Sequence, residues 1–307
     1  MSVSSDLPST TEVTLSDLIS YSQPSAAIKL LKPTARALQS GQYLARFKGR
    51  GMEFDEVRPY APGDDIRSLD WRVTARTGKV HTKLFREERE RPIFLFVDHR
   101  AGMFFATRGV FKAVLAARLA SLLAWSACRH GDRVGGVVLS GDGIEALPPD
   151  HGHSSVLRLL RRLAISRDPS VRSELKLSDG LKRLALHIKP GSLVFVVSDF
   201  RDFDETSGAT LGAMAAHSNI ALIMVSDPIE QRLPFGRHFY GNGQRDVAVD
   251  ADRSTLQEYS LRFERRLEQI KTFARRHQMQ LLRALTTDLP VDVLSRSSSR
   301  KGRVLGR

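Results

Sequence analysis

The chain contains 307 residues, 41% of them hydrophobic, and carries a formal net charge of +13. A chain of this length and composition can bury the core of a globular protein, in one large domain or two small ones. Its single cysteine, Cys128, excludes an intramolecular disulfide and a cysteine-based zinc site, which suits a reducing cytoplasm.

The positive charge is concentrated in two places. Residues 29–50 and the C-terminal residues 295–307 contain basic side chains and no carboxylate side chain. Such segments either form a solvated basic surface or bind polyanions such as nucleic acid and anionic lipid. Both interpretations stay open.

The sequence predicts neither a signal peptide nor a transmembrane segment. Residues 1–13 lack the basic and then apolar layout of a secretory signal. The longest apolar stretch, residues 110–127, is interrupted by Lys112 and Arg118. We therefore expect a cytoplasmic protein, with a peripheral position at the inner membrane left open.

Residues 1–45 are predicted to form an N-terminal helical arm, because TLSDLISYS has an amphipathic pattern with a serine or threonine cap and a second helix can begin after Pro33. Residues 46–90 instead show alternating polar and apolar residues and frequent turn signals. Pro62 and Gly63 suit a type II turn, in which glycine takes the positive φ. We expect strands and turns in this segment, including strands at MEFDEVRPY, SLDWRVTA and VHTKLFREE.

From residue 91 onward, apolar strands alternate with helices. The predicted strands are IFLFVD, RVGGVVLS, SLVFVVSD, NIALIMVSD and MQLLRALTT, and helices are expected at about 109–129, 154–163, 208–217 and 254–277. Continuous apolar strands between helices indicate a mostly parallel sheet that is covered on both faces. The predicted fold class is therefore α/β, with a doubly wound sheet over residues 91–290 and a disordered basic tail at residues 291–307.

Ligands of doubly wound folds bind beyond the carboxyl ends of the strands. At these places Asp98, Asp199 and Asp227 each end an apolar stretch. Two such carboxylates can hold Mg²⁺, which prefers oxygen ligands, or each aspartate can cap the segment that follows it. Arg100 favours the second interpretation, because its guanidinium is permanently charged, repels a cation and pairs with carboxylates. We expect no bound cofactor, with Mg²⁺ as the alternative.

A metal-dependent nuclease is a further alternative. Asp98, Asp199, Asp202 and Asp204 together could form a two-metal centre, and the basic surface would suit a nucleic-acid substrate. Asp202 and Asp204, however, lie in the polar loop DFRDFDET, where solvation explains them, and Arg100 opposes a bound metal here too. The sequence contains no nucleophile elbow and no phosphate-binding glycine loop. We therefore predict that the protein is not an enzyme.

Residues 56–76 form the densest group of charged and aromatic side chains. Charges of both signs surround Tyr60 and Trp71 and can form a salt-bridged surface that holds the segment against a neighbouring domain. Aromatic and arginine side chains also anchor protein interfaces, so the same surface can dock a partner. The residues of this surface are Glu56, Arg58, Tyr60, Gly63, Asp64, Asp65, Arg67, Asp70, Trp71 and Arg76.

The same stretch, RPYAPGDDIRSLDWRVTARTGKVHTKLFREERE, closely resembles the signature of a bacterial family catalogued as domain of unknown function 58. The resemblance continues through FLFVD, VVSDF, VSDPIEQRLP and DRSTLQEYSLRFERR and covers about residues 40–290. Members of that family look like von Willebrand factor A domains and tend to be encoded beside MoxR-type AAA+ ATPases. The resemblance implies a protein-binding adaptor or co-chaperone for such an ATPase and its client proteins, with polyanion binding and nuclease activity as the alternatives.

Von Willebrand factor A domains often carry a metal-ion-dependent adhesion site that opens with the motif D-x-S-x-S. By this resemblance Asp98 occupies the first position, Arg100 and Gly102 replace both serines, and Asp199 fills the closing acidic position. The resemblance therefore implies a degenerate site. We hypothesise that the Arg100 guanidinium takes the place of the cation and bridges Asp98 and Asp199.

Overall fold

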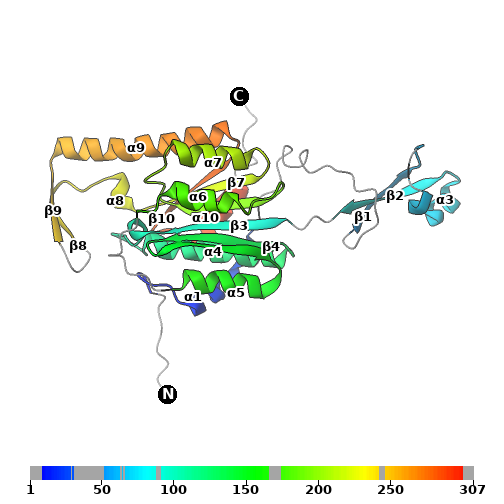
Figure 1. Ribbon diagram of the computed structural model, residues 1–307, viewed down its shortest axis with the longest axis horizontal. Coiled ribbons are helices and arrows are strands. Elements are labelled where there is room, and N and C mark those ends of the chain that lie inside the picture. The colour runs from blue at the N-terminus through cyan, green and yellow to red at the C-terminus, as the bar shows by residue number, and fades with distance from the viewer. Residues whose placement is uncertain are drawn as a thin grey trace, which may run out of the picture. The chain divides into compact units, whose positions relative to one another are not determined.

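The computed structural model describes residues 9–28, 30, 52–62, 64, 66–87, 91–165, 174–241 and 246–299. The chain divides into two compact units. The larger unit combines Met1–Gly41 with Arg91–Arg307, and the smaller unit is Gln42–Glu90. Figure 1 labels the helices and strands of both units.

The larger unit is built on a six-stranded sheet in the order β10-β7-β6-β3-β4-β5. Its strands are β3 (Pro92–His99), β4 (Arg133–Ser140), β5 (Gly143–Asp150), β6 (Leu193–Ser198), β7 (Asn219–Ser226) and β10 (Gln280–Leu285). All neighbours pair in parallel except β4 and β5, which are antiparallel. Every residue of β3, β6 and β7 is buried, which explains their largely apolar sequences. The predicted doubly wound, mostly parallel α/β fold is confirmed.

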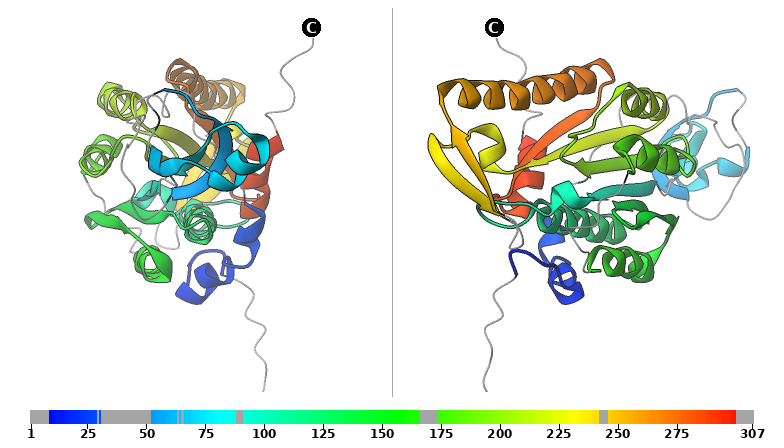
Figure 2. Two further views of the ribbon diagram at one scale, coloured as in Figure 1. Left: turned by 90° about the vertical axis from the view of Figure 1, so that its right-hand side faces the viewer. Right: turned by 60° about the vertical axis from the view of Figure 1, so that its left-hand side comes forward.

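Helices cover both faces of this sheet (Figure 1, Figure 2). One face carries α1 (Leu15–Ser20), α4 (Lys112–Arg129), α5 (Gly152–Leu163) and α10 (Pro290–Ser299), and the other carries α6 (Leu177–Ala185), α7 (Glu205–Ala215) and α9 (Arg253–Arg276). Successive residues of β3 point to opposite faces, so Leu95 and Val97 join the core beside α4, whereas Phe94 and Phe96 join the core beside α6. The sheet thus separates two hydrophobic cores. Among the described helices, none has the length and apolar character needed to cross a bilayer.

The carboxyl ends of β3, β6 and β7 lie along one edge of the sheet, because these strands are parallel neighbours. The 3-10 helix η3 (Ala101–Met103) follows β3 at this edge, and the short helix α8 (Pro228–Gln231) follows β7. After α8 the chain forms an antiparallel hairpin of β8 (Gly236–Gly241) and β9 (Asp246–Ala251). This carboxyl edge is where the sequence predicts the site.

The prediction of a separate arm at residues 1–45 differs from the structure. In the described part, α1 and the 3-10 helix η1 (Pro24–Ala27) pack on α4 as part of the larger unit. Leu18 is fully buried there, and the Ser121 hydroxyl donates a hydrogen bond to the Leu18 carbonyl oxygen (2.6 Å). A single short helix is not stable alone in water, so it docks on an apolar neighbour. The predicted helix after Pro33 lies outside the described residues.

The C-terminal tail also begins later than predicted. Helix α10 continues the larger unit to residue 299, and its Val293 and Leu294 are buried beside α4. The prediction of disorder is therefore wrong for residues 291–299. It followed the basic composition of the tail and did not weigh the apolar pair Val293 and Leu294. Residues 300–307 lie outside the described part of the chain.

The smaller unit pairs β1 (Met52–Pro59) with β2 (His81–Glu87) in antiparallel register. The 3-10 helix η2 (Ile66–Ser68) and the helix α3 (Trp71–Thr77) stand between these strands in the sequence. The strands predicted at MEFDEVRPY and VHTKLFREE are confirmed as β1 and β2, whereas the strand predicted at SLDWRVTA is wrong.

Helix α3 forms because Asp70 caps it. The Asp70 carboxylate accepts hydrogen bonds from the backbone N–H groups of Arg72 (3.0 Å) and Val73 (3.1 Å). The helix ends at Gly78, which takes a left-handed φ of 70°. A strong cap at each end outweighs the β-branched residues between them, which had indicated a strand.

Candidate functional site

Asp98, Asp199 and Asp227 lie along the carboxyl edge of the sheet, at the ends of β3, β6 and β7. Their side chains are almost completely buried, with exposed fractions of 1%, 3% and 0%. A buried carboxylate must be matched by hydrogen-bond donors or by a cation. Each of the three aspartates is matched by a different set of groups.

Arg100 holds the first of these carboxylates in a bidentate pair. Its Nε and Nη2 atoms donate hydrogen bonds to Asp98 Oδ1 (3.0 Å) and Oδ2 (2.8 Å), and the Ser198 hydroxyl donates a third to Oδ2 (2.7 Å). On its other side Arg100 donates from Nη1 and Nη2 to the two carboxylate oxygens of Asp202 (2.5 and 2.8 Å). The hypothesis that Arg100 bridges Asp98 and Asp199 is therefore wrong in its second partner, which is Asp202.

Lys112 is the cation that matches Asp199. This side chain is fully buried, and its Nζ donates to Asp199 Oδ2 (2.8 Å) and to Glu230 Oε1 (2.9 Å). Arg201 adds a second cation, which donates to Glu230 Oε1 and lies 3.4 Å from Asp199 Oδ2. Arg100 forms no hydrogen bond with Asp199, which Lys112, at the start of α4, neutralises instead. Sequence reasoning missed Lys112, whose signal is a lysine that opens an otherwise apolar helix.

Asp227 serves as a cap and not as a ligand. It accepts hydrogen bonds from the backbone N–H of Ile229 (3.0 Å), from the N–H (2.9 Å) and hydroxyl (2.5 Å) of Thr107, and from the Thr286 hydroxyl (2.8 Å). The capping interpretation of this aspartate is thus the one that the structure supports. Asp204 behaves in the same way at α7, where it accepts from the Ser207 N–H (2.7 Å).

The residues of the 56–76 surface belong to the smaller unit. Arg58 pairs with Asp64 (2.7 Å), and Asp64 also accepts from the Ala61 N–H (2.9 Å). Tyr60 and Trp71 are exposed by 36% and 68%. Arg67 lies in η2, Arg76 lies in α3, Glu56 is described only as backbone within β1, and Gly63 and Asp65 lie outside the described residues.

A family model described as "Protein of unknown function DUF58" matches residues 56–280, which include Arg100, Lys112 and the whole of the 56–76 surface. The chain belongs to this family. The DUF58 resemblance inferred from the signature sequence is therefore confirmed.

Relatives of this DUF58 chain are found in bacteria. It is 30% identical over 244 residues to "Uncharacterized protein Rv1480" of Mycobacterium tuberculosis, and the aligned region covers 77% of this chain and 73% of that protein. It is 31% identical over 110 residues to "Uncharacterized protein YeaD" of Bacillus subtilis, and the aligned region covers 36% of this chain and 25% of that protein. A solved structure titled "Uncharacterized Membrane Spanning Protein from Vibrio fischeri" aligns with 71% of this chain and 100% of that one, at 15% identity and a TM-score of 0.27.

The ionic state of the DUF58 carboxyl edge follows from two opposing effects. Burial alone would raise the pKa of Asp199, but the Lys112 ammonium and the Arg201 guanidinium hold it below its usual value. Burial likewise opposes the charged form of Asp202, and the hydrogen bonds from Arg100 outweigh it and lower the pKa. Both carboxylates are therefore ionised at neutral pH, each against a protein cation.

This arrangement does not fit a divalent metal ion. A hard cation needs several free oxygen ligands, whereas the oxygens of Asp98 and Asp199 already receive the donors of Arg100 and Lys112. In the described part of the DUF58 chain, no group of three or more His, Cys, Asp or Glu side chains is placed to hold a metal. Gly102, near Asp199 Oδ2, supplies no side-chain ligand. The ammonium and the guanidinium stand where a cation would pair with these carboxylates.

We expect the stability of this DUF58 protein to fall in acid. The pKa values of Asp199, Asp202 and Asp227 are lowered in the folded state, for Asp227 because hydrogen bonds from Thr107 and Ile229 outweigh burial. Their contribution is complete above the unfolded pKa of about 3.9 and is lost as the pH falls through the lower folded values. Urea midpoints measured between neutral pH and the acid limit should therefore drop below about pH 4.

The variant Asp202→Asn is the matched test of this pH effect. It removes one of these three carboxyl groups with a lowered pKa. The side chain of Asp202 is one-third exposed, so the chain should still fold. The urea midpoint of this variant should fall less steeply with decreasing pH than that of the wild-type chain. A wild-type midpoint that stays constant through the acid range would contradict the ionic description of the edge.

Proposed function

We propose that this DUF58 protein is a non-catalytic protein-binding module. The observation that carries the proposal is the exposure of Trp71 (68%) and Ile66 (67%) on the smaller unit, with Val80 also exposed (45%). Among the described residues of this unit, the buried side chains are Asp70 and Thr82, both polar. Large apolar side chains that are exposed on a small unit are typical of an interface.

The size of the smaller unit supports this proposal. A two-stranded sheet with one short helix is marginally stable by itself in water. Contact with another surface would remove the apolar area of Trp71 and Ile66 from water, at a gain of about 25 cal/mol per Å². Tryptophan and arginine are enriched at the centres of interfaces, and α3 begins with Trp71 followed by Arg72.

The carboxyl edge supports the absence of catalysis. Asp98, Asp199 and Glu230 are paired with Arg100, Lys112 and Arg201, and Asp227 is occupied by hydrogen bonds, so none of these carboxylates is available as a base or as a metal ligand. We propose that the larger unit is of von Willebrand factor A type, with a degenerate adhesion site at Asp98, Arg100, Gly102 and Asp199. The partner that the family resemblance favours is a MoxR-type AAA+ ATPase, in the cytoplasm.

A second candidate function is polyanion binding, which the net charge of +13 favours. Ionic strength separates the two functions. Binding to nucleic acid or anionic lipid weakens steeply as salt rises, because counterions are released on binding. A protein complex centred on Trp71 is held mainly by apolar contact and should lose little affinity over the same range.

The substitution Trp71→Ala tests the proposed function. We expect it to weaken binding to the purified MoxR-type ATPase of the same bacterium by about 30-fold, the effect of losing a 2 kcal/mol interface anchor. Leu186→Ala is the matched control, because Leu186 is 74% exposed on the larger unit. Biolayer interferometry with and without ATP gives the dissociation constants. Equal affinities for the wild-type chain and the Trp71→Ala variant would contradict the proposal.

A further inference from the structure

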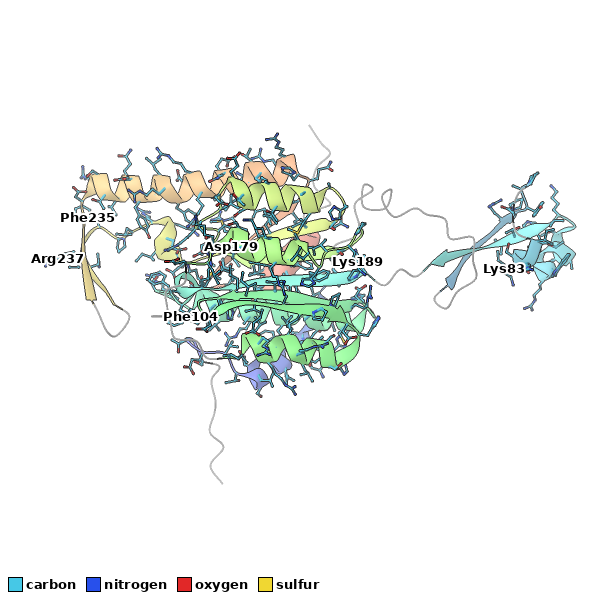
Figure 3. The ribbon with its side chains drawn as sticks, viewed as in Figure 1. Lys83, Phe104, Asp179, Lys189, Phe235 and Arg237 are labelled. Atoms are coloured by element: carbon cyan, nitrogen blue, oxygen red, sulfur yellow. The ribbon has the colours of Figure 1, made fainter. Side chains whose placement is uncertain are left out.

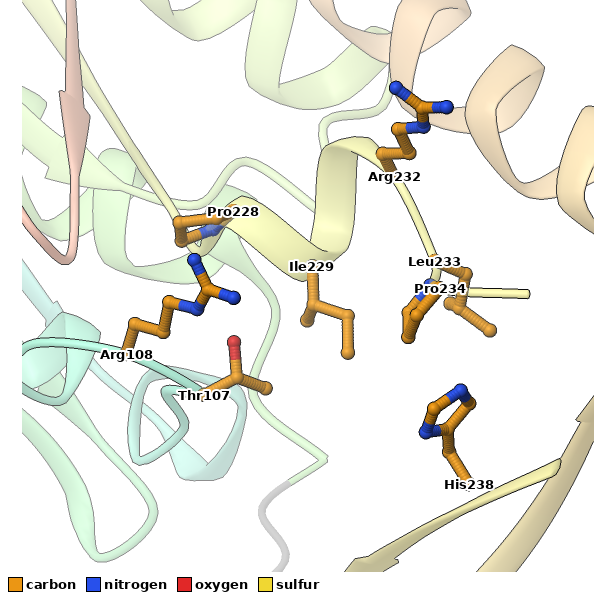
Figure 4. A pocket seen from close by; sticks show the side chains of 8 residues that line it. All are labelled: Thr107, Arg108, Pro228, Ile229, Arg232, Leu233, Pro234 and His238. Atoms are coloured by element: carbon orange, nitrogen blue, oxygen red, sulfur yellow. The ribbon is translucent and has the colours of Figure 1, made fainter. Parts of the chain in front are cut away.

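A pocket of about 460 Å³ opens in the larger unit between the loop after β3, helix α8 and the β8–β9 hairpin. This volume lies within the range of pockets that hold small molecules or short peptide segments. Its floor is aliphatic and consists of Pro228, Ile229, Leu233 and Pro234. Figure 4 shows Ile229 at the centre, with Leu233 and Pro234 on one side and Thr107 on the other.

The pocket is held open by buried hydrogen bonds. Asp227 accepts hydrogen bonds from the N–H and hydroxyl of Thr107 and from the Ile229 N–H, so a single buried carboxylate positions two of the lining residues. Gly109 fixes the loop further, because it has a φ of +76° and a Cβ added there would lie 2.1 Å from the Thr286 carbonyl oxygen. Such a pocket needs little reorganisation to receive a ligand.

The rim of the pocket is positive. Arg108 and Arg232 are both exposed, and no described carboxylate forms an ion pair with either. His238 also lines the pocket, with Nε2 3.0 Å from the Phe235 carbonyl oxygen. No carboxylate is among the lining side chains, and the nearby Asp227 is fully buried. The pocket therefore joins an aliphatic floor to two arginine donors.

We propose that this pocket binds an extended peptide segment of a partner protein that carries an apolar side chain and a carboxylate. The apolar side chain packs on Ile229 and Leu233, and the carboxylate pairs with Arg108 and Arg232, whose guanidinium groups suit bidentate contact. His238 is the one aromatic ring among the eight lining residues, whereas four of them are aliphatic, which suits an apolar peptide side chain. Phe235, which is 70% exposed at the start of the hairpin beside Arg237, offers further apolar contact to a longer segment (Figure 3).

This inference deepens the proposed protein-binding function by giving a second surface and the chemistry of its ligand. The carboxylate can come from a protein C-terminus or from an aspartate or glutamate side chain. The experiment below distinguishes these two sources.

The test uses the full chain and a fluorescent acetylated peptide of alternating leucine and aspartate with a free C-terminus, followed by fluorescence anisotropy. Two companion peptides carry either a C-terminal amide or asparagine in place of aspartate. We expect saturable binding, weakened at least about tenfold by the double substitution Arg108→Gln and Arg232→Gln. Whichever companion peptide binds more weakly identifies the carboxylate that the pocket uses.

The matched control is the double substitution Arg183→Gln and Arg253→Gln. It removes the same charge from two exposed arginines outside the pocket, so it should leave peptide affinity unchanged. Ile229→Ser should weaken binding as well, whereas Trp71→Ala should not, which separates this result from the test of the proposed function. Equal weakening by both arginine doubles, or binding of laurate but of none of the peptides, would overturn the inference.

Discussion

Replacing Lys112 by methionine is expected to lower the free energy of unfolding by about 3–5 kcal/mol, the cost of breaking a buried ion pair. The substitution preserves side-chain length and removes the ammonium that donates to Asp199 and Glu230. Both carboxylates are only 3% exposed, so water cannot replace the lost donor. Arg201 remains, but half of its side chain is exposed and it reaches Asp199 only at 3.4 Å.

Urea unfolding of the full chain measures this effect. Lys182→Met is the matched control, because Lys182 is exposed on α6 and its loss should change stability by less than about 0.5 kcal/mol. Adding Glu230→Gln to the Lys112→Met variant should recover part of the loss, since one unpaired buried charge disappears. Similar midpoints for Lys112→Met and Lys182→Met would show that the buried ammonium does not stabilise the fold.

Arg100→Ser should destabilise the protein by about 2–3 kcal/mol, less than a fully buried pair because Asp202 is one-third exposed. The substitution leaves Asp98 with hydrogen bonds from the Ser198 hydroxyl and the backbone N–H of residue 100. It also vacates the space between Asp98 and Asp202, where two carboxylates and two hydroxyl groups could then serve as oxygen ligands. Millimolar Mg²⁺ should therefore raise the melting temperature of this variant and leave that of Arg183→Ser unchanged.

The sequence predicts the central fold because the signals there are local and strong. The apolar run that ends in Asp98 is a strand buried on both faces, and its neighbours after residues 192 and 218 repeat the pattern. Strand β5, helix α6 and the β8–β9 hairpin were not predicted from the sequence. The hairpin pairs Gly236–Gly241 with Asp246–Ala251. The charged residues Arg237 and Asp250 interrupt the alternation of polar and apolar residues that would indicate strands. Helix α3 was not predicted, because its interior residues favour a strand and the cap at Asp70 is what makes the segment helical.

The site was predictable only where its partners are close in sequence. Arg100 follows Asp98 by two residues, so their pairing can be read from the end of one strand. Lys112 and Asp199 are 87 residues apart, and only the fold brings the start of α4 to the end of β6. Asp202 had a sufficient explanation as a solvated loop residue, and its bond to Arg100 spans 102 positions. Long-range ion pairs of this kind leave no periodic signal.

Calorimetric titration of the wild-type chain with MgCl₂ and CaCl₂ tests most directly whether Arg100 and Lys112 neutralise the carboxyl edge in place of a metal ion. We predict no saturable heat into the millimolar range for the wild-type chain, and measurable Mg²⁺ binding for the Arg100→Ser variant under the same conditions. Micromolar binding to the wild-type chain that disappears on Asp98→Asn would contradict this, because it would place a free cation site at the end of β3.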